Sequence, residues 1–158
     1  MKDENYTEII GASEKVQTIR ELIERVAGTG LSVLITGETG TGKELVARSL
    51  YEHSDRNNDP FVKVNCAALP DTLMESELFG YEQGAFTGAN QKRRGKFQLS
   101  NNGTLFLDEI GDMSFYLQSK LLRVLQDGSF SPLGSEKEVK SNAWIIAATN
   151  KDIESEIQ

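Results

Sequence analysis

A glycine-rich segment that ends at Lys43 has the residue types and the spacing of a phosphate-binding loop. The chain reads GETGTGK from Gly37 to Lys43, directly after an apolar run and directly before a helix-forming run. Gly37, Gly40 and Gly42 have no Cβ, so the turn can adopt positive φ and bring backbone N–H groups close to an anion. The N-terminus of the following helix favours negative charge at the same place. The pattern GxxxxGK therefore predicts a site for nucleotide phosphates, with Lys43 on the outer ones. The alternative is a glycine-rich turn that binds nothing.

Two adjacent carboxylates give a second signal for nucleotide chemistry. Asp108 and Glu109 follow an apolar run over residues 104–107, which predicts a buried strand. Ligands of open α/β sheets bind at the C-terminal ends of the strands, and the phosphate loop leaves its own strand at that edge. We expect Asp108 to orient magnesium or its water and Glu109 to polarise the attacking water, a role worth about 10²–10⁴ in rate. Without the phosphate loop, the pair would be interpreted as a solvated turn.

Three further residues bear on the same site. The usual phosphate loop has Ser or Thr after its lysine, with a hydroxyl on magnesium, but this chain has Glu44. The group that contacts magnesium is therefore left open, and Asp108 acting through water is the expected one. Asn65 and Asn150 end two other predicted strands, and each can hydrogen-bond the water, the γ-phosphate or Glu109. The alternative for both is an ordinary turn asparagine.

Strands alternate with helices along the chain. Apolar periodicity and turn residues predict helices over 14–27, 42–53, 72–78, 95–99 and 114–127 and strands over 31–36, 61–65, 104–107 and 143–148. They also predict an irregular hairpin over 130–140. Thr72 and Glu75 suggest a capping box, and Leu117, Leu121 and Leu125 form one predicted apolar stripe. This order of elements is typical of an α/β fold, with a parallel sheet and helices on both faces.

The composition excludes several classes of protein. The 158 residues suit one domain, and a hydrophobic content of 38% permits a packed core. No apolar run approaches the roughly 18 residues that cross a bilayer, and the polar N-terminus has no secretion signal. A single cysteine, Cys66, excludes an internal disulfide, and together with one histidine, His53, it argues against a zinc site. We therefore expect a cytoplasmic protein with no membrane partner.

The charge argues against a nucleic-acid-binding face. Lys and Arg number 17 against 24 Asp and Glu, which gives a net charge of −7. A broad electrostatic surface for DNA is therefore not expected. Four cations do gather at Lys92, Arg93, Arg94 and Lys96. They could contact phosphate, but a solvated loop is the favoured interpretation.

Together these motifs resemble the AAA+ ATPase domain of bacterial sigma-54-dependent transcription activators, also called enhancer-binding proteins. The likeness extends from the IIG sequence at 9–11 to the end of the chain. Its most specific part follows ELFG at 77–80 and is the hexapeptide of Gly84, Ala85, Phe86, Thr87, Gly88 and Ala89. In the family this segment projects from a ring surface and contacts sigma-54. Composition alone favours a buried aromatic turn, because aromatic side chains are more often core than contact residues.

The resemblance implies a fold and a nucleotide site. The fold would be a three-layer αβα sandwich of the P-loop NTPase (AAA+) type with a mainly parallel sheet, as one partial domain over 1–158 with 1–8 loose. Adenine would lie near Ile10 and Gly11. The phosphates would contact the loop and the residues that follow it, namely Gly37, Glu38, Thr39, Gly40, Thr41, Gly42, Lys43, Glu44 and Leu45.

The resemblance also implies residue roles. Glu44 would be a family trait, since the family carries GKE. Asn65 would switch the catalytic glutamate in response to the nucleotide, Asn150 would be a sensor, and the hairpin near 128–139 would be a second pore-side loop.

The implied activity is a motor for promoter opening. ATP with Mg²⁺ would bind between subunits of a homo-oligomeric ring, usually a hexamer, with Lys43 on the phosphates, Asp108 on the metal and Glu109 activating water. The γ-phosphate state would reach the Phe86–Thr87 tip through Asn65 and the following helix, and the tip would remodel the complex of RNA polymerase with sigma-54. We expect no direct DNA binding by this part.

Family members continue with a fifth core strand, arginine fingers and a helical lid, which do not occur before Gln158. A sensory domain, such as the receiver of a two-component system, and a helix-turn-helix for DNA are also not visible. We therefore expect part of a longer regulator, with weak nucleotide binding, little turnover and poor ring assembly on its own. Trans-acting arginines are worth about 10³–10⁵ in rate in comparable phosphoryl transfers.

Three other functions compete with this one. A P-loop kinase would need an acceptor pocket, and the hexapeptide has no place in it. A nucleic-acid translocase would need a basic pore loop, whereas the Phe86–Thr87 tip is uncharged. A non-enzymatic module that senses nucleotide and binds a partner remains the main alternative, and intact Asp108 and Glu109 argue against it.

Overall fold

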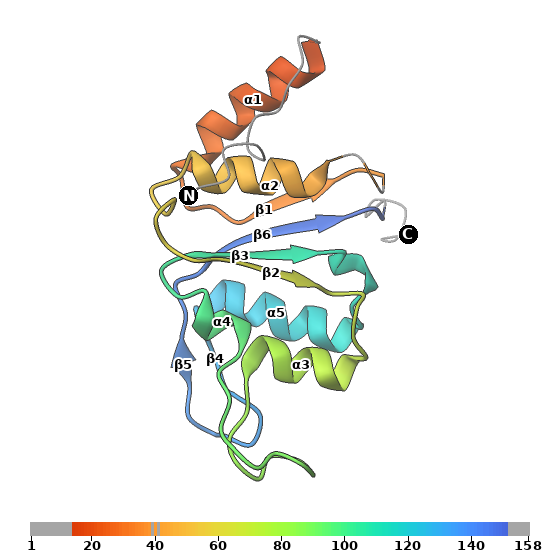
Figure 1. The fold of residues 1–158 in the computed structure, drawn as a ribbon, viewed down its shortest axis with the longest axis vertical. Coiled ribbons are helices and arrows are strands. Elements are labelled where there is room, and N and C mark those ends of the chain that lie inside the picture. Colours follow the sequence, from red (N-terminus) through yellow and green to blue (C-terminus); the bar gives the residue numbers. More distant parts are fainter. Residues whose placement is uncertain (1–13, 39, 41, 152–158) are drawn as a thin grey trace.

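Four parallel strands form the central layer of the molecule (Figure 1). The computed structural model describes residues 14–38, 40 and 42–151. The sheet has the order β1-β6-β3-β2, and its strands are β1 (Val33–Thr36), β2 (Phe61–Asn65), β3 (Thr104–Asp108) and β6 (Trp144–Thr149). Helices cover both faces of this sheet, so the predicted α/β three-layer fold is confirmed. Ile10, Gly11, Thr39 and Thr41 lie outside the described residues.

Two helices cover one face of the sheet. They are α1 (Glu14–Ala27) and α2 (Lys43–Glu52), and Figure 1 shows both above β1 and β6. Their apolar side chains, including Ile23 and Leu50, pack with Phe106, Ile146 and Ala148 of the two central strands.

The other face packs on α3 (Asp71–Phe79), α4 (Lys96–Leu99) and α5 (Phe115–Asp127). Leu105 and Leu107 of β3 enter this second core, whereas Phe106 between them enters the first. Successive side chains of a strand point to opposite faces. A central parallel strand therefore needs apolar side chains on both faces, which is why Leu105, Phe106 and Leu107 follow one another without polar alternation.

Three short elements complete the described fold. A 3₁₀ helix, η1 (Ile110–Asp112), directly follows the acidic pair, and β4 (Ser129–Phe130) pairs antiparallel with β5 (Val139–Lys140). The predicted irregular hairpin is thus confirmed. Within the described residues, no helix combines the length and the apolar character that crossing a bilayer requires.

The predicted capping box of the third helix is wrong. Helix α3 begins at Asp71 after Pro70, with no side-chain cap, so Thr72 already lies in its first turn. Glu75 instead accepts hydrogen bonds from Tyr116 Oη at 3.0 Å and Lys120 Nζ at 2.8 Å. The carboxylate therefore ties α3 to α5, because a partner on another helix competes with the local backbone for it.

Candidate active site

The residues singled out for nucleotide chemistry meet at one edge of the sheet. In the parallel register, Thr36 lies beside Thr149, and Asn65 lies beside Asp108. Gly37 N donates to Thr149 O at 3.3 Å, so the phosphate loop leaves β1 directly beside the end of β6. All four strands thus end at the same edge, where ligands of open α/β sheets bind.

The phosphate loop has the backbone that its glycines predict. Gly40 and Gly42 adopt φ values of 84° and 83°, in the left-handed region that favours glycine. Lys43, the first residue of α2, is only 8% exposed. Its Nζ donates to Gly37 O at 2.7 Å and to Glu38 O at 2.9 Å. The ammonium is therefore held inside the loop by two carbonyl groups that phosphate oxygens can replace.

The acidic pair carries an unusual backbone conformation. Asp108 ends β3 half-buried, and its carbonyl accepts a hydrogen bond from Cys66 N at 2.9 Å. Glu109 adopts φ 56° and ψ 47°, the left-handed region, which costs a non-glycine residue about 1–2 kcal/mol. Its carbonyl accepts the Asp112 N–H at 3.1 Å, which starts η1. Strain of this kind clusters at functional sites, so the conformation supports a chemical role for this side chain.

The segment after Glu109 packs directly on the end of β6. Lys151 Nζ donates to Gly111 O at 2.7 Å and lies 3.5 Å from a carboxylate oxygen of Asp112. A Cβ on Gly111 would lie 2.7 Å from Thr149 Oγ1. Sequence reasoning missed Gly111 and Lys151, and the only available signal was a glycine two residues after the acidic pair.

The two asparagines differ in their surroundings. Asn65 Oδ1 accepts the Ala67 N–H at 3.0 Å, so Asn65 does form an Asx turn. Its side-chain nitrogen makes no hydrogen bond within the described part of the chain, so it can still donate to a ligand. Asn150 is exposed directly after β6, whose last residue, Thr149, is buried.

Glu44 is held by two cations. Lys63 Nζ of β2 lies 2.8 Å from Oε2, and Arg48 Nη2 lies 3.4 Å from Oε1. The hydrogen bond from Lys63 is the main reason that the pKa of Glu44 is lowered. This ion pair stabilises the fold above the ordinary pKa of the carboxyl group. The stabilisation is lost as the pH falls through the lowered pKa, because the protonated carboxyl group of Glu44 is neutral and no longer forms the ion pair.

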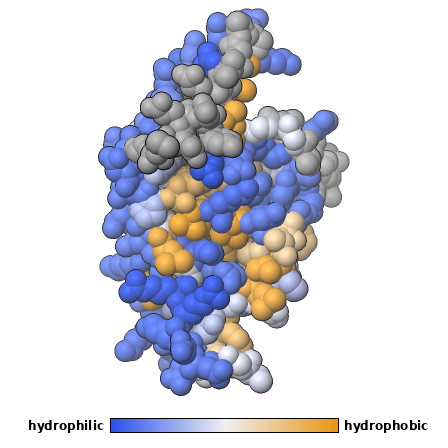
Figure 2. All heavy atoms as spheres, viewed as in Figure 1, coloured by the Kyte–Doolittle hydropathy of each residue, from blue (hydrophilic) through white to orange (hydrophobic). Residues whose placement is uncertain are grey.

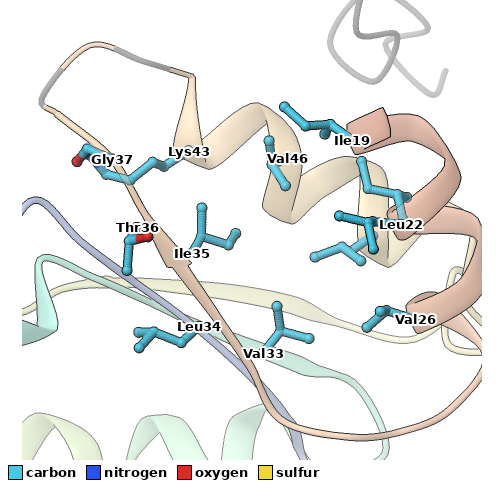
Figure 3. Close-up of a pocket in the computed structure, with 12 residues that line it drawn as sticks. Ile19, Leu22, Val26, Val33, Leu34, Ile35, Thr36, Gly37, Lys43 and Val46 are labelled. Carbon is cyan, nitrogen blue, oxygen red and sulfur yellow. The ribbon is translucent and has the colours of Figure 1, made fainter. Parts of the chain in front are cut away.

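A cavity of about 410 Å³ lies between α1, α2 and β1, with Gly37 and Lys43 at one end. Figure 3 shows apolar side chains from all three elements around it. Its walls include Ile19, Leu22, Val26, Val33, Ile35 and Val46. An apolar wall next to a phosphate-binding loop suits a ligand with an aromatic base at one end and phosphates at the other.

The hexapeptide of residues 84–89 lies away from this edge, beyond α3 and α4 (Figure 1). Phe86 is 43% exposed, with its ring centroid 4.8 Å from that of Tyr81, whereas Ala89 is buried. The buried aromatic turn favoured by composition is therefore wrong for Phe86, because glycines at positive φ on either side turn the tip outward. Figure 2 shows a few apolar and weakly polar atoms beside strongly hydrophilic ones at this end of the molecule.

The hairpin supports the base of this loop. Leu133 N donates to Gly80 O at 3.0 Å, and Glu82 N donates to Leu133 O at 3.0 Å. Gly134 adopts φ 77°, and a Cβ there would lie 2.8 Å from that of Ala85. The two segments therefore pack backbone against backbone, which leaves only the tip of the loop free.

The cations near the loop are mostly paired with carboxylates. Lys92 lies 3.3 Å from Glu82, and Arg93 and Lys96 lie 3.5 Å and 3.9 Å from Glu77. These ion pairs favour the interpretation of residues 92–96 as a solvated loop over a phosphate site. Across the described residues, no group of three His, Cys, Asp or Glu side chains is placed to hold a metal ion.

Cys66 should resist thiol reagents in the folded protein. It is buried, and burial raises the pKa of its thiol to about 12, with Asp108, Asp112 and Glu109 adding to the shift. The thiolate, which is the nucleophile, is therefore scarce at neutral pH. We expect iodoacetamide labelling, followed by mass spectrometry at pH 8, to be slow until denaturant unfolds the chain. Rapid labelling under native conditions would contradict this placement.

Comparison with known proteins agrees with these features. A family model described as the Sigma-54 interaction domain matches residues 9–158. Over 155 residues the chain is 54% identical to the anaerobic nitric oxide reductase transcription regulator NorR of Aliivibrio fischeri, covering 98% of the chain and 30% of that protein. It is also 53% identical over 151 residues to the formate hydrogenlyase transcriptional activator FhlA of Escherichia coli, covering 96% of the chain and 22% of that protein. The chain thus spans less than a third of the length of these relatives.

Solved structures agree as well. NtrX from Brucella abortus, in a crystal structure with ATP, superposes with a TM-score of 0.86 at 41% identity, covering 96% of the chain and 32% of NtrX. A P-loop NTPase domain of an Escherichia coli sigma-54 activator superposes with a TM-score of 0.59 at 18% identity, covering 92% and 82% of the two chains. The second likeness concerns the fold alone.

Proposed function

The chain belongs to the family of sigma-54 interaction domains, and we propose that it binds and hydrolyses ATP to act on RNA polymerase that carries sigma-54. The relatives named above are transcription regulators. In this proposal several copies form a ring, and the nucleotide lies between neighbouring subunits. The chain is one partial AAA+ domain of such a regulator.

The observation that carries the proposal is the meeting of the phosphate loop and the acidic pair at one edge of the sheet. Lys43 is held inside the loop, ready to exchange two carbonyl partners for phosphate oxygens. Glu109 keeps a costly left-handed backbone directly after β3, at the same edge of the sheet. In the proposed reaction Lys43 and the loop amides bind the phosphates, and Glu109 removes a proton from the attacking water. A module that only sensed nucleotide would have no need of that strained glutamate.

The oxygen donors fit magnesium. Asp108 is a half-buried carboxylate at the end of a strand, and Mg²⁺ prefers one or two carboxylates together with phosphate oxygens and water. Both carboxylate oxygens of Glu44 are engaged by cations. We therefore assign the metal to Asp108, directly or through water. The ion would neutralise charge on the phosphates during transfer.

The base of the nucleotide would rest on the apolar side of the loop. The cavity between α1, α2 and β1 supplies that wall, and Leu45 follows the loop in α2. Ile10 and Gly11 would complete the adenine pocket, and Thr39 and Thr41 would complete the phosphate loop.

A short path joins the site to the hexapeptide. Asn65 ends β2 beside Asp108, α3 begins at Asp71, and the chain enters the loop after Phe79. Met74, Leu78 and Phe79 fix α3 in the core. A shift at Asn65 in response to the γ-phosphate, with Asn150 sensing the same group, can thus reach Phe86 through one packed helix.

The partner assignment can be tested with two exposed phenylalanines. We expect Phe86→Ala to lower binding to immobilised sigma-54, in the presence of an ATP transition-state analogue, by about 10-fold or more, as for an exposed aromatic hot spot. Phe115→Ala is the matched control, since Phe115 is 86% exposed on α5. Equal binding by both variants and the wild type would overturn the assignment.

A further inference from the structure

Glu44 creates an electrostatic problem for the proposed phosphate site. It is the second residue of α2, next to Lys43 and at the helix end that would bind the phosphates. A carboxylate there gains from the helix dipole. However, it also repels a ligand with several negative charges, by about 0.5–2 kcal/mol per charge pair at 8 Å for an effective dielectric constant between 20 and 80. The site therefore needs the carboxylate neutralised or turned away.

Two cations in the structure neutralise the Glu44 carboxylate and fix its orientation. Lys63 Nζ lies 2.8 Å from Glu44 Oε2, and Arg48 Nη2 lies 3.4 Å from Oε1. Arg48 stands one turn further along the same helix, and its guanidinium lies 4.8 Å from the centroid of the Phe61 ring. Both cations are thus directed to one carboxylate, and a metal ion would have to compete with them for its oxygens.

Lys63 comes from a distant part of the sheet. β2 lies at the edge opposite β1, so the ion pair links the helix after the phosphate loop to the far edge strand. Lys63 also precedes Asn65 by two residues, and alternate residues of a strand lie on the same face. The lysine therefore fixes Glu44 to the strand that ends beside Asp108.

We propose that Lys63 is a positioning residue for nucleotide binding: it neutralises Glu44 and holds the carboxylate away from the phosphates, so that the loop binds ATP without Glu44 as a metal ligand. This inference rests on the proposed function, because it requires phosphates at the N-terminus of α2. Loss of Lys63 frees a negative charge whose effect grows with the charge of the ligand. ATP binding should thus suffer more than ADP binding.

The test is calorimetric titration of the chain with ATP and with ADP, each with Mg²⁺, at two salt concentrations. Lys63→Met should weaken ATP binding about 3- to 10-fold at low salt, and should weaken ADP binding and high-salt binding less, because salt screens the freed charge. Lys63→Arg should keep the wild-type affinity. Lys140→Met is the matched control, since Lys140 is an exposed strand lysine of β5 and its loss changes the net charge equally.

A double variant separates charge from structure. In a Glu44→Gln background, Lys63→Met should have no further effect on ATP affinity, because no carboxylate is left to neutralise. A loss that persists in that background, or that is equal for ATP and ADP, would mean that Lys63 acts only on folding, and would overturn the inference. Wild-type chain that binds neither nucleotide would instead overturn the proposed function itself.

Discussion

Replacing Glu109 by Gln should lower ATP turnover by about 10²–10⁴-fold, the usual contribution of a general base, with ATP affinity changed by no more than about twofold. The amide keeps the shape of the side chain but cannot accept the proton of the attacking water. Turnover should be followed over a range of protein concentrations, because a ring contributes groups from neighbouring subunits. At concentrations where the wild type hydrolyses ATP measurably, equal turnover by the variant would exclude Glu109 as the base.

A second change at the same position separates chemistry from backbone strain. Glu109 has φ 56°, which a glycine adopts without the Cβ penalty. Glu109→Gly should therefore be as inactive as Glu109→Gln but more stable by about 1 kcal/mol in urea unfolding, because it removes a left-handed non-glycine residue. Equal stability of the two variants would show that the conformation costs the protein nothing.

Replacing Lys43 by Ala should weaken ATP binding by about 10- to 100-fold, because hydrogen bonds to charged groups contribute about 1.5–3 kcal/mol. Lys43 is buried, and within the described residues its ammonium donates to the loop carbonyls of Gly37 and Glu38. Calorimetry measures the affinity, and thermal unfolding checks that the variant folds. Lys137→Ala, on the exposed hairpin, controls for the lost charge.

Unchanged affinity of Lys43→Ala would contradict the role of the loop. An equal loss in Lys137→Ala would also contradict it, since the effect would then follow net charge rather than position.

The order of elements could be predicted because the signals are local. Apolar periods, glycine stops and the alternation of strands with helices predicted the described α-helices and the strands of the four-stranded sheet within a few residues. The convergence of Asn65 and Asp108 also followed, since parallel strands end at the same edge.

Details that depend on packing were harder to predict. The apolar stripe of α5 was expected to contain Leu125, but that residue is 41% exposed, and Val124 is buried with Leu117 and Leu121. A helix of 3.6 residues per turn brings position i+7 back to the core more closely than position i+8. Glu75 was likewise predicted to cap its own helix, but it accepts a hydrogen bond from Lys120 of another helix.

Contacts across the fold had no signal in the sequence. The pairing of Glu44 with Lys63 joins residues on α2 and β2, and no spacing rule connects them. The left-handed backbone of Glu109 and the close packing of Gly111 on Thr149 also arise only when η1 meets the end of β6. A glycine or a glutamate in a sequence does not disclose such a constraint.

The most direct test of the nucleotide site is an NMR titration of the ¹⁵N-labelled chain with a non-hydrolysable ATP analogue and Mg²⁺. We predict the largest amide shifts at Gly40, Gly42 and Lys43, with smaller ones at Asp108 and Asn150 across the sheet edge. The amide signal of Lys140 in the hairpin should not shift. Shifts confined to residues away from the ends of β1 and β3, or none at saturating ligand, would contradict the account.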